Sequence, residues 1–392
     1  MIALEPFSTP RETLHRLLDR LLPDLSAGAN VLVKPEWCAR ARPRPAENTS
    51  PAFIEALLSW LDARGARVAL AHSSLLTPPD VPYMSFTDLL KLEGVDYLME
   101  DFPHVRLIDL ETEPMRLRRS GEVELLAPAT LDEVDLFIHC ARLKTHMATT
   151  IAVGTKGLMG LLPDSENLRM HRDGLDRLLA HLGDAVAPSL TLVEADVGME
   201  GNGPHHGQDV ACGIYFGGDD LLAVDSAAAG LMGFEPADVA HLVGLAALQG
   251  RDLPGLPEEW KRWVRPFAPA GDHLQHKKVT VWPGDSCATC HLAAASVEDH
   301  VRSNPHHLGD LAAVASMLYM RGFHIFMGHH DPERPPPEGQ ASVAVGACAA
   351  EWAQAHGVPL VPGCPVRYHQ VQPTLMQLIR DMSRGRLEAG SS

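Results

Sequence analysis

Two lysines and a histidine lie close together in one stretch of the chain, from Cys140 to Pro163, among apolar and small residues. Lys144 and His146 end a predicted buried strand, and Lys156 follows ten residues later in a glycine-rich segment. Burial of several cationic groups in one place is costly unless they bind an anion. The alternative is a solvated loop with two ordinary surface lysines. A histidine moves protons near neutral pH, and a lysine in such a loop binds anions or forms covalent bonds. We expect a catalytic site made of Lys144, His146 and Lys156.

Four of the seven cysteines lie in the last third of the chain. Three of them directly follow predicted strands and should meet at one edge of a sheet, and the fourth lies one helical turn from the first. Four thiolates gathered at one place need a metal to offset their repulsion. Zinc and iron–sulfur clusters are both held by four cysteines, although the wide, uneven spacing fits a zinc ribbon poorly. The predicted ligands are Cys287, Cys290, Cys348 and Cys364.

The elements that must position the first group alternate between strands and helices. Strands are predicted at 30–34, 66–70, near 97, and at 105–110, 123–127, 134–139, 190–194 and 212–216. Helices are predicted at 52–64, 86–92, 175–182 and 223–232. This alternation predicts an α/β fold, with a mostly parallel sheet covered by helices on both faces.

Ligands of such sheets bind beyond the carboxyl ends of the strands. Several polar residues fall just after predicted strands, so we expect them to converge there and bind the substrate: Lys34, Ser73, Ser74 and Asn202. Glu200, His205 and His206 are metal-ligand candidates of second rank. Asp225 is interpreted either as a helix N-cap or as a ligand contact.

A chain of 392 residues is longer than one hydrophobic core normally requires, so we expect two domains. The α/β domain should span 1–250, followed by a Pro-rich linker at 251–277. A small α/β domain with the cysteine cluster should span 278–392, with strands at 278–282, 323–327, 342–345 and 358–361 and a helix at 308–320.

Net charge, the lengths of apolar runs and the cysteine count indicate which kind of partner and which cellular compartment to expect. A formal net charge of −17 argues against nucleic acid or an anionic membrane as the main partner. Neither a signal peptide nor a run of ~20 apolar residues is present. Seven cysteines, an odd number, fit a reducing cytoplasm better than a disulfide framework. We therefore expect a cytoplasmic protein that binds a small anionic substrate.

The order of motifs resembles the family named domain of unknown function 362. The resemblance covers about residues 28–245 and rests on Lys34-Pro35-Glu36, Ser50-Pro51, Ser73-Ser74, Lys144-Thr145-His146, Gly154 to Gly160, Met199 to Pro204 and Ala223-Val224-Asp225. One departure is Glu36-Trp37, where the family commonly has an asparagine. Members of the family often carry iron–sulfur modules, which implies redox chemistry.

A second resemblance, to lactate racemase, rests on the spacing of His146 and Lys156, with Gly154 before the lysine and Pro163 after it. It implies that His146 is an acid/base and that Lys156 tethers a nickel-pincer nucleotide. His171 lies near the place of a metal-binding histidine in that enzyme, and we include it among the substrate-binding candidates.

The cysteine motifs resemble those of the iron–sulfur small subunits of hydrogenases and quinone reductases. The matching segments are Cys287-Ala288-Thr289-Cys290, Gly346-Ala347-Cys348-Ala349 and Val361-Pro362-Gly363-Cys364-Pro365. The resemblance implies a [4Fe–4S] cluster, with structural zinc as the alternative. The main functional hypothesis is thus an iron–sulfur oxidoreductase with an electron-transfer partner. Its alternatives are a non-redox isomerase or epimerase with structural metal, and a binding protein with structural zinc.

Overall fold

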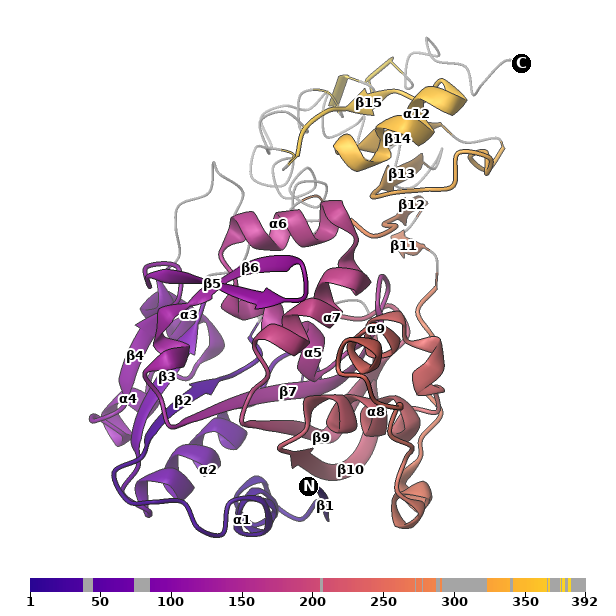
Figure 1. Ribbon diagram of the computed structural model, residues 1–392. Coiled ribbons are helices and arrows are strands. Elements are labelled where there is room, and N and C mark those ends of the chain that lie inside the picture. The colour runs from indigo at the N-terminus through magenta and orange to yellow at the C-terminus, as the bar shows by residue number, and fades with distance from the viewer. Residues whose placement is uncertain are drawn as a thin grey trace. The chain divides into compact units, whose positions relative to one another are not determined.

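The computed structural model describes residues 1–37, 45–73, 85–204, 207–271, 273–276, 278–286, 290, 323–338, 341–364, 366, 374, 376–377 and 380–381. These residues form two compact units, one up to Ala270 and one from Gly271 onward (Figure 1). Each unit has a sheet of its own, in agreement with the predicted α/β fold plus a smaller α/β part.

The first unit is built on an eight-stranded sheet in the order β1-β10-β9-β7-β2-β3-β4, with β8 paired to β7. The neighbours from β9 to β4 run parallel, whereas β1, β10 and β8 pair antiparallel. The strands are β1 (Ile2–Pro6), β2 (Asn30–Lys34), β3 (Arg67–His72), β4 (Arg106–Asp109), β7 (Leu136–His146), β8 (Thr150–Ala152), β9 (Leu190–Glu200) and β10 (Gln208–Gly218). The mostly parallel sheet is confirmed.

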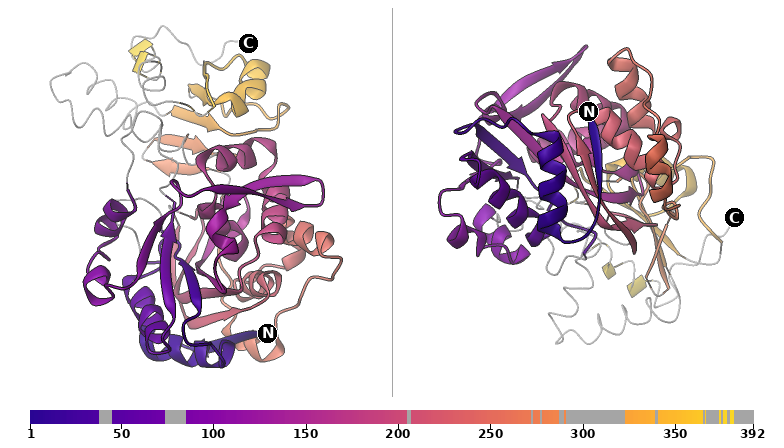
Figure 2. Two further views of the ribbon diagram at one scale, coloured as in Figure 1. Left: turned by 60° about the vertical axis from the view of Figure 1, so that its left-hand side comes forward. Right: turned by 90° about the horizontal axis from the view of Figure 1, so that it is seen from below.

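Helices cover both faces of this sheet (Figure 2). One face packs on α1 (Pro10–Leu21), α2 (Pro51–Asp62) and α3 (Phe86–Glu93). The other packs on α5 (Gly154–Gly157), the 3₁₀ turn η2 (Leu158–Leu161), α7 (Leu175–Ala185), α8 (Leu221–Leu231) and α9 (Ala240–Leu248). Side chains of β7 alternate between these cores: Ile138 and Cys140 face the first, Phe137 and Ala141 the second.

Shorter elements complete the unit. They are α4 (Leu98–Asp101), the hairpin β5 (Met115–Ser120) and β6 (Val123–Pro128), α6 (Asp164–Asp173), and the 3₁₀ turns η1 (Ala129–Asp132), η3 (Pro236–Asp238) and η4 (Glu258–Trp263). The prediction of a strand near residue 97 is wrong, because Tyr97 is the N-cap of the helix α4.

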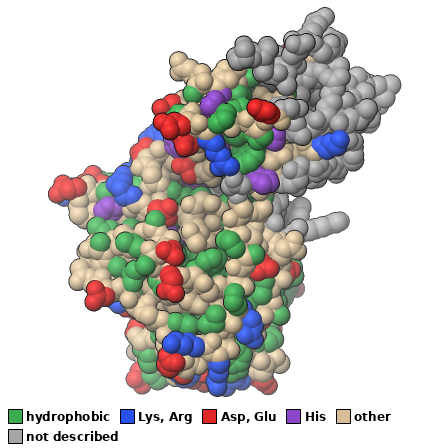
Figure 3. Space-filling view, turned by 90° about the vertical axis from the view of Figure 1, so that its right-hand side faces the viewer, with side chains coloured by type: hydrophobic (Ala, Val, Ile, Leu, Met, Phe, Trp, Pro, Cys, Tyr) green, Lys and Arg blue, Asp and Glu red, His purple; other side chains and the backbone are tan. Residues whose placement is uncertain are grey.

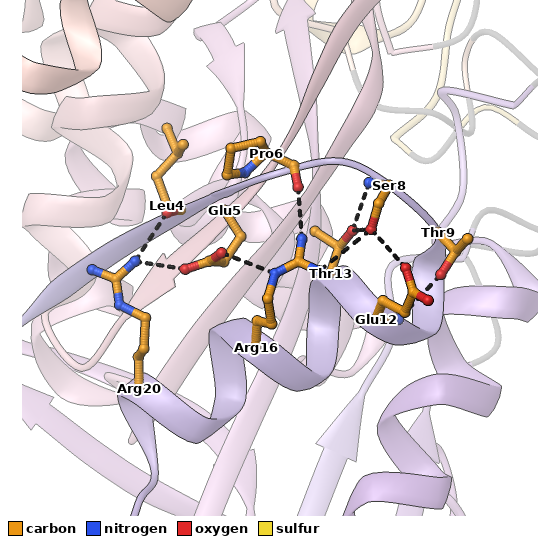
Figure 4. Close-up of polar contacts among 9 residues, drawn as sticks. All are labelled: Leu4, Glu5, Pro6, Ser8, Thr9, Glu12, Thr13, Arg16 and Arg20. Carbon is orange, nitrogen blue, oxygen red and sulfur yellow. Dashed lines mark hydrogen bonds and ion pairs between the residues drawn. The ribbon is translucent and has the colours of Figure 1, made fainter.

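Local signals explain several element starts. Ser50 accepts a hydrogen bond from Phe53 N and caps α2, with Pro51 in the first turn, as the sequence predicts. Figure 4 shows how α1 is fixed to β1: Glu5 bonds Arg16 at 3.2 Å and Arg20 at 2.6 Å. Both arginines are about half exposed, so these ion pairs set orientation more than stability.

The Pro-rich segment after residue 250 was predicted to be a linker that ends at residue 277. Its first part, up to Ala270, belongs to the first unit. Trp260 and Phe267 are buried in the core beside α8, which gives this segment a packing role.

The second unit contains a five-stranded sheet in the order β11-β12-β13-β14-β15. Its strands are β11 (Leu274–His276), β12 (Val279–Trp282), β13 (Phe323–Met327), β14 (Ser342–Val345) and β15 (Leu360–Val361). The last four are parallel, and the turn η6 (Ala347–Ala349) and helix α12 (Ala350–His356) follow β14. The helix predicted at 308–320 lies outside the described residues.

In the part of the chain that the structure describes, no helix has the length and apolar character needed to cross a bilayer. Figure 3 shows acidic and basic side chains interspersed with apolar ones over one face of the molecule.

Candidate functional site

Two predicted substrate-binding residues meet beneath the turn that follows Lys156. Lys34 ends β2, Ser73 follows β3, and both are buried. Ser73 Oγ donates to Gly160 O at 2.8 Å, and a Cβ on Gly160 would lie 3.0 Å from Lys34 Nζ. The glycine therefore gives the ammonium room, and the ends of two parallel strands converge as expected for this fold.

Lys144 is neutralised inside the protein. Its ammonium forms an ion pair with Glu36 and donates to Glu47 O at 2.9 Å, and its side chain is fully buried. The second oxygen of Glu36 accepts from Arg142 N at 3.1 Å. Glu36 stands where the sequence departs from the family pattern, and the structure gives it a role as the counter-ion of Lys144.

The charges of both lysines act on one buried histidine. Lys34 follows Val33, which faces the α2 core, and so points toward η2. Burial, the charge of Lys34 and the charge of Lys144 all lower the pKa of His139. A Cβ on Gly157 would lie 3.7 Å from Glu36 Oε2, so the counter-ion of Lys144 also borders the turn after Lys156.

His146, the last residue of β7, is half-buried and anchored. Its Nδ1 accepts a hydrogen bond from Ala148 N at 3.1 Å, so in the neutral ring the proton resides on Nε2. Nε2–H is therefore the hydrogen-bond donor of the neutral His146 ring.

The loop that contains Asn202 packs against the end of β7. Thr145 Oγ1 donates to Gly201 O at 2.7 Å, and Met147 N donates to Gly203 O at 3.2 Å. A Cβ on Gly203 would lie 2.0 Å from Thr145 O, which explains the glycine at that position. Half-buried Asn202 is thus next to the His146 segment, and its role in binding the substrate stays a prediction.

Lys156 lies on the four-residue helix α5 and is half-buried. Asp225 of α8 accepts from the first two amides of α5, at Gly154 and Thr155. Asp220, at 3.1 Å from Ala223 N, is the residue that caps α8 itself. The interpretation of Asp225 as the N-cap of its own helix is wrong: Asp225 lies inside α8, and its carboxylate accepts from the amides of α5 instead.

Two buried histidines near Lys34 were not singled out in the sequence. Burial and the adjacent Lys34 charge lower the pKa of His72 to about 3, and the same causes hold the pKa of His139 well below its ordinary value. Both rings are therefore neutral at physiological pH. A Cβ on Gly157 would lie 2.4 Å from His139 Nε2, so the His139 ring packs directly against the turn that contains Lys156. Their position at the ends of β3 and in β7, level with Lys34, is the signal that could have identified them.

A buried ion pair joins the middle strands. Arg142 and Glu194 are 2.7 Å apart and almost completely buried, and the carboxylate also accepts from Ser50 N and Oγ. The pairing of β7 with β9 is irregular between Arg142 and Lys144. Irregular strand pairing often lies beside functional sites because it redirects side chains. Sequence reasoning missed this pair, since an arginine inside a strand pattern carries no distinct signal.

The remaining site candidates of the first unit are His171 and Glu200, together with three residues outside the described part of the chain. His171 is buried on α6, which packs on α7. Glu200 accepts from Ala268 N at 2.8 Å and so fixes the segment before Ala270. Ser74, His205 and His206 lie outside the described residues.

In the second unit, the loops that carry three of the four predicted cysteine ligands lie together. Cys290 Sγ would be 3.3 Å from a Cβ on Gly346, whose φ of +98° favours glycine. Ala347 N donates to Gly363 O at 2.8 Å, which joins the segments that lead into Cys348 and Cys364. All three thiols are free of disulfides. Cys287 lies outside the described residues. Among the residues that the structure does describe, no group of three His, Cys, Asp or Glu side chains is arranged to hold a metal.

Residues 31–230, just over half of the chain, match the family described as "Domain of unknown function (DUF362)". The chain belongs to this family. The DUF362 region contains every candidate residue described above for the first unit, and the cysteines of the second unit lie beyond it.

This DUF362 protein is also similar to a curated protein in sequence and to a solved structure. It is 24% identical over 218 residues to a thylakoid-associated protein of Synechocystis sp., a match that covers 54% of this chain and 65% of that one. The chain thus spans less than two thirds of that relative's length. A solved structure, the lactate racemase apoprotein of Thermoanaerobacterium thermosaccharolyticum, aligns with 91% of this chain and 86% of its own, at 12% identity and a TM-score of 0.40.

Proposed function

We propose that this chain is an isomerase-type enzyme that moves a proton at a carbon atom of a small anionic substrate. The observation that carries the proposal is the fixed orientation of His146 at the end of β7. Because Ala148 N donates to Nδ1, the neutral ring carries its proton on Nε2. In the proposed reaction the neutral ring removes the carbon proton as a general base, with loss of the Ala148 hydrogen bond, and the resulting imidazolium returns a proton to the carbon as a general acid.

The charge of the substrate is inferred from the cationic and amide groups of the same unit. Lys156 and Asn202 are half-buried, whereas Lys34 and Lys144 are fully buried. In the proposed complex, Lys156 pairs with the substrate's carboxylate or phosphate, and Asn202 donates from its amide. Lys34 adds positive potential from below, and Lys144, paired with Glu36, supports the end of β7.

The test is proton exchange with solvent. Purified protein is incubated in D₂O with a panel of 2-hydroxy and 2-amino carboxylic acids, and deuterium at the substrate carbon is followed by NMR. The proposal predicts deuterium incorporation without any added electron donor or acceptor. Turnover that requires a redox partner would overturn it.

A second function, an iron–sulfur oxidoreductase, is favoured by the cysteine loops of the second unit. The chemistry of thiolates from Cys290, Cys348 and Cys364, with Cys287 as the fourth, fits a [4Fe–4S] cluster or zinc. A bound cluster would supply one-electron transfer; zinc would stabilise the unit only. The nickel-pincer nucleotide is the least favoured cofactor, since it rests only on the resemblance of the stretch from His146 to His171, in which Lys156 would be the tether.

Metal and acid-labile sulfide are measured on protein purified without oxygen. Iron and sulfide near four per chain would support the redox function. Zinc alone would leave the isomerase as the remaining enzymatic function.

A further inference from the structure

Helix α5 is too short to hold itself in place, yet it carries Lys156. Its first amides need acceptors from elsewhere in the chain. Asp225 supplies both: Oδ1 accepts from Gly154 N at 2.8 Å, and Oδ2 accepts from Thr155 N at 2.7 Å. One fully buried carboxylate of α8 therefore fixes the start of the turn that presents Lys156.

The close approach of α8 and α5 depends on a glycine. A Cβ on Gly154 would lie 2.7 Å from Leu221 Cδ1 and 2.8 Å from Asp225 Oδ1. Any larger residue would push the amides away from the carboxylate. The glycine before Lys156 is thus explained by its contact with α8, without reference to a ligand.

Asp225 is connected with the surface through a second helix. His241 of α9 is buried, and its charge, when present, acts on Asp225. Its Nδ1 lies 3.1 Å from Asp176 Oδ1 at the start of α7, and that carboxylate is one-third exposed. Its Nε2 is buried with no hydrogen-bond partner in the described part of the chain. Asp176, His241 and Asp225 form a series from solvent to α5.

We propose that Asp225 is the positioning residue for Lys156 and that His241 and Asp176 control the charge of Asp225 from the surface. A charged carboxylate holds both amides of α5. A protonated one presents a hydroxyl to one of them and releases it. The inference rests on the proposed function only in treating Lys156 as a site residue.

The electrostatics of Asp225 agree with this role. Burial raises its pKa above the ordinary 3.8, and the hydrogen bonds from Thr155, the charge of His241 and the hydrogen bond from Gly154 oppose the rise. Thr155 and Gly154 act on Asp225 through hydrogen bonds, whereas His241 acts through its charge. Acidification should therefore loosen the Lys156 turn at a higher pH than an ordinary carboxyl would allow.

Amide exchange tests the proposal without any use of turnover. The full chain is labelled with ¹⁵N-glycine and ¹⁵N-threonine, and exchange at Gly154 and Thr155 is followed by NMR. In Asp225→Asn we expect exchange at these two amides to be about tenfold faster or more, because one acceptor is replaced by a donor. In His241→Gln, protection at Thr155 should be lost at a higher pH than in the wild type. The matched control is Asp220→Asn, which alters the cap of the same helix and should leave both amides unchanged.

A second readout separates positioning from a structural role. The acylation rate of Lys156 relative to exposed Lys91 is measured against pH by mass spectrometry. We expect its pH profile to shift in Asp225→Asn and His241→Gln but not in Asp220→Asn. Unchanged exchange at Gly154 and Thr155, or equal acceleration at distant amides such as Gly94, would overturn the inference. Failure of the D₂O assay would overturn the proposed function and leave this result standing.

Discussion

At the scale of single residues, two buried cations of the first unit are each paired with a specific carboxylate. Lys144 has Glu36, and Arg142 has Glu194. Lys34 donates to Pro35 O at 3.1 Å and lies beside His72 and His139, whose pKa values are lowered by burial and by the Lys34 charge. A buried pair adds little stability by itself, but removal of one partner leaves a charge without compensation.

The Glu36–Lys144 pair gives the first prediction. Glu36→Gln should lower the free energy of unfolding by about 3 kcal/mol, since the Lys144 ammonium remains buried without a counter-ion. Urea denaturation measures the effect. The double variant with Lys144→Met should recover most of it; a double variant as unstable as the single one would contradict the assigned pairing.

The neutral histidines give a pH prediction. The folded protein keeps His72 unprotonated down to a pKa of about 3, while the unfolded chain binds a proton near 6.5. The contribution of neutral His72 to the free energy of unfolding is therefore fully present above pH 6.5 and is lost as the pH is lowered toward 3. The slope contributed by His72 should be about 1.4 kcal/mol per pH unit.

Urea denaturation at several pH values between 4 and 7 measures this slope. His72→Phe keeps an aromatic ring between Trp37 and Phe86 but does not titrate, so the slope should decrease. His104→Phe, a change at a half-exposed histidine, should leave it unaltered. Equal slopes in all three proteins would show that His72 is not the titrating group.

At the scale of elements, the site depends on short segments pressed against strand ends. Gly157 and Gly160 bring α5 and η2 down onto His139 and Lys34. Gly203 does the same for the Asn202 loop against Thr145. The first two contacts lie where Lys34 pairs with His139, and the third lies at the far end of β7, near His146, seven residues beyond His139.

Gly157→Ala should destabilise the protein by about 1–3 kcal/mol, because its Cβ would meet the His139 ring. It should also change the acylation rate of Lys156. Thermal unfolding and the labelling ratio to Lys91 measure the two effects. The control is Gly255→Ala, where a Cβ has open space around it; a loss as large in the control would refute a site-specific clash.

At the scale of the whole molecule, the first unit carries the proton-transfer chemistry of our proposal, and the second carries the four cysteines of the predicted metal site. Each unit has its own sheet, and the segment 251–270 belongs to the first. The metal content of the second unit should therefore depend on the cysteines that follow β14 and β15.

Cys348→Ser and Cys364→Ser should each reduce bound metal by more than half, since a ligand is lost from a four-thiolate site. Cys212→Ser, a change at a buried cysteine of the first unit, should not. Metal analysis of the purified variants decides the matter. Full metal content in both ligand variants would show that the ligand assignment is wrong.

Much of the fold could be predicted from sequence, because β-branched runs and Gly or Pro boundaries mark the parallel strands. The helix α9 was missed, since its apolar residues show no amphipathic period. The predicted strand ends placed Lys34 near Ser73, and Asn202 near the His146 segment. Lys34 is level with His139, seven residues before His146, and a shared binding role stays a prediction. Pairings such as Glu36 with Lys144 and Asp225 with α5 were beyond reach, because they join residues 70 or more positions apart. Local pattern carries no information on which distant side chain neutralises a buried charge.

The most direct measurement of the central claim is solvent deuterium exchange by His146→Gln. With a substrate identified from the panel, wild type and the variant are compared with His104→Gln, a half-exposed histidine of the same unit. We predict a loss of about 100-fold or more in His146→Gln, with wild-type exchange in the control, because glutamine cannot deliver a proton. Wild-type exchange in a folded His146→Gln protein would contradict the assignment of His146 as the proton donor.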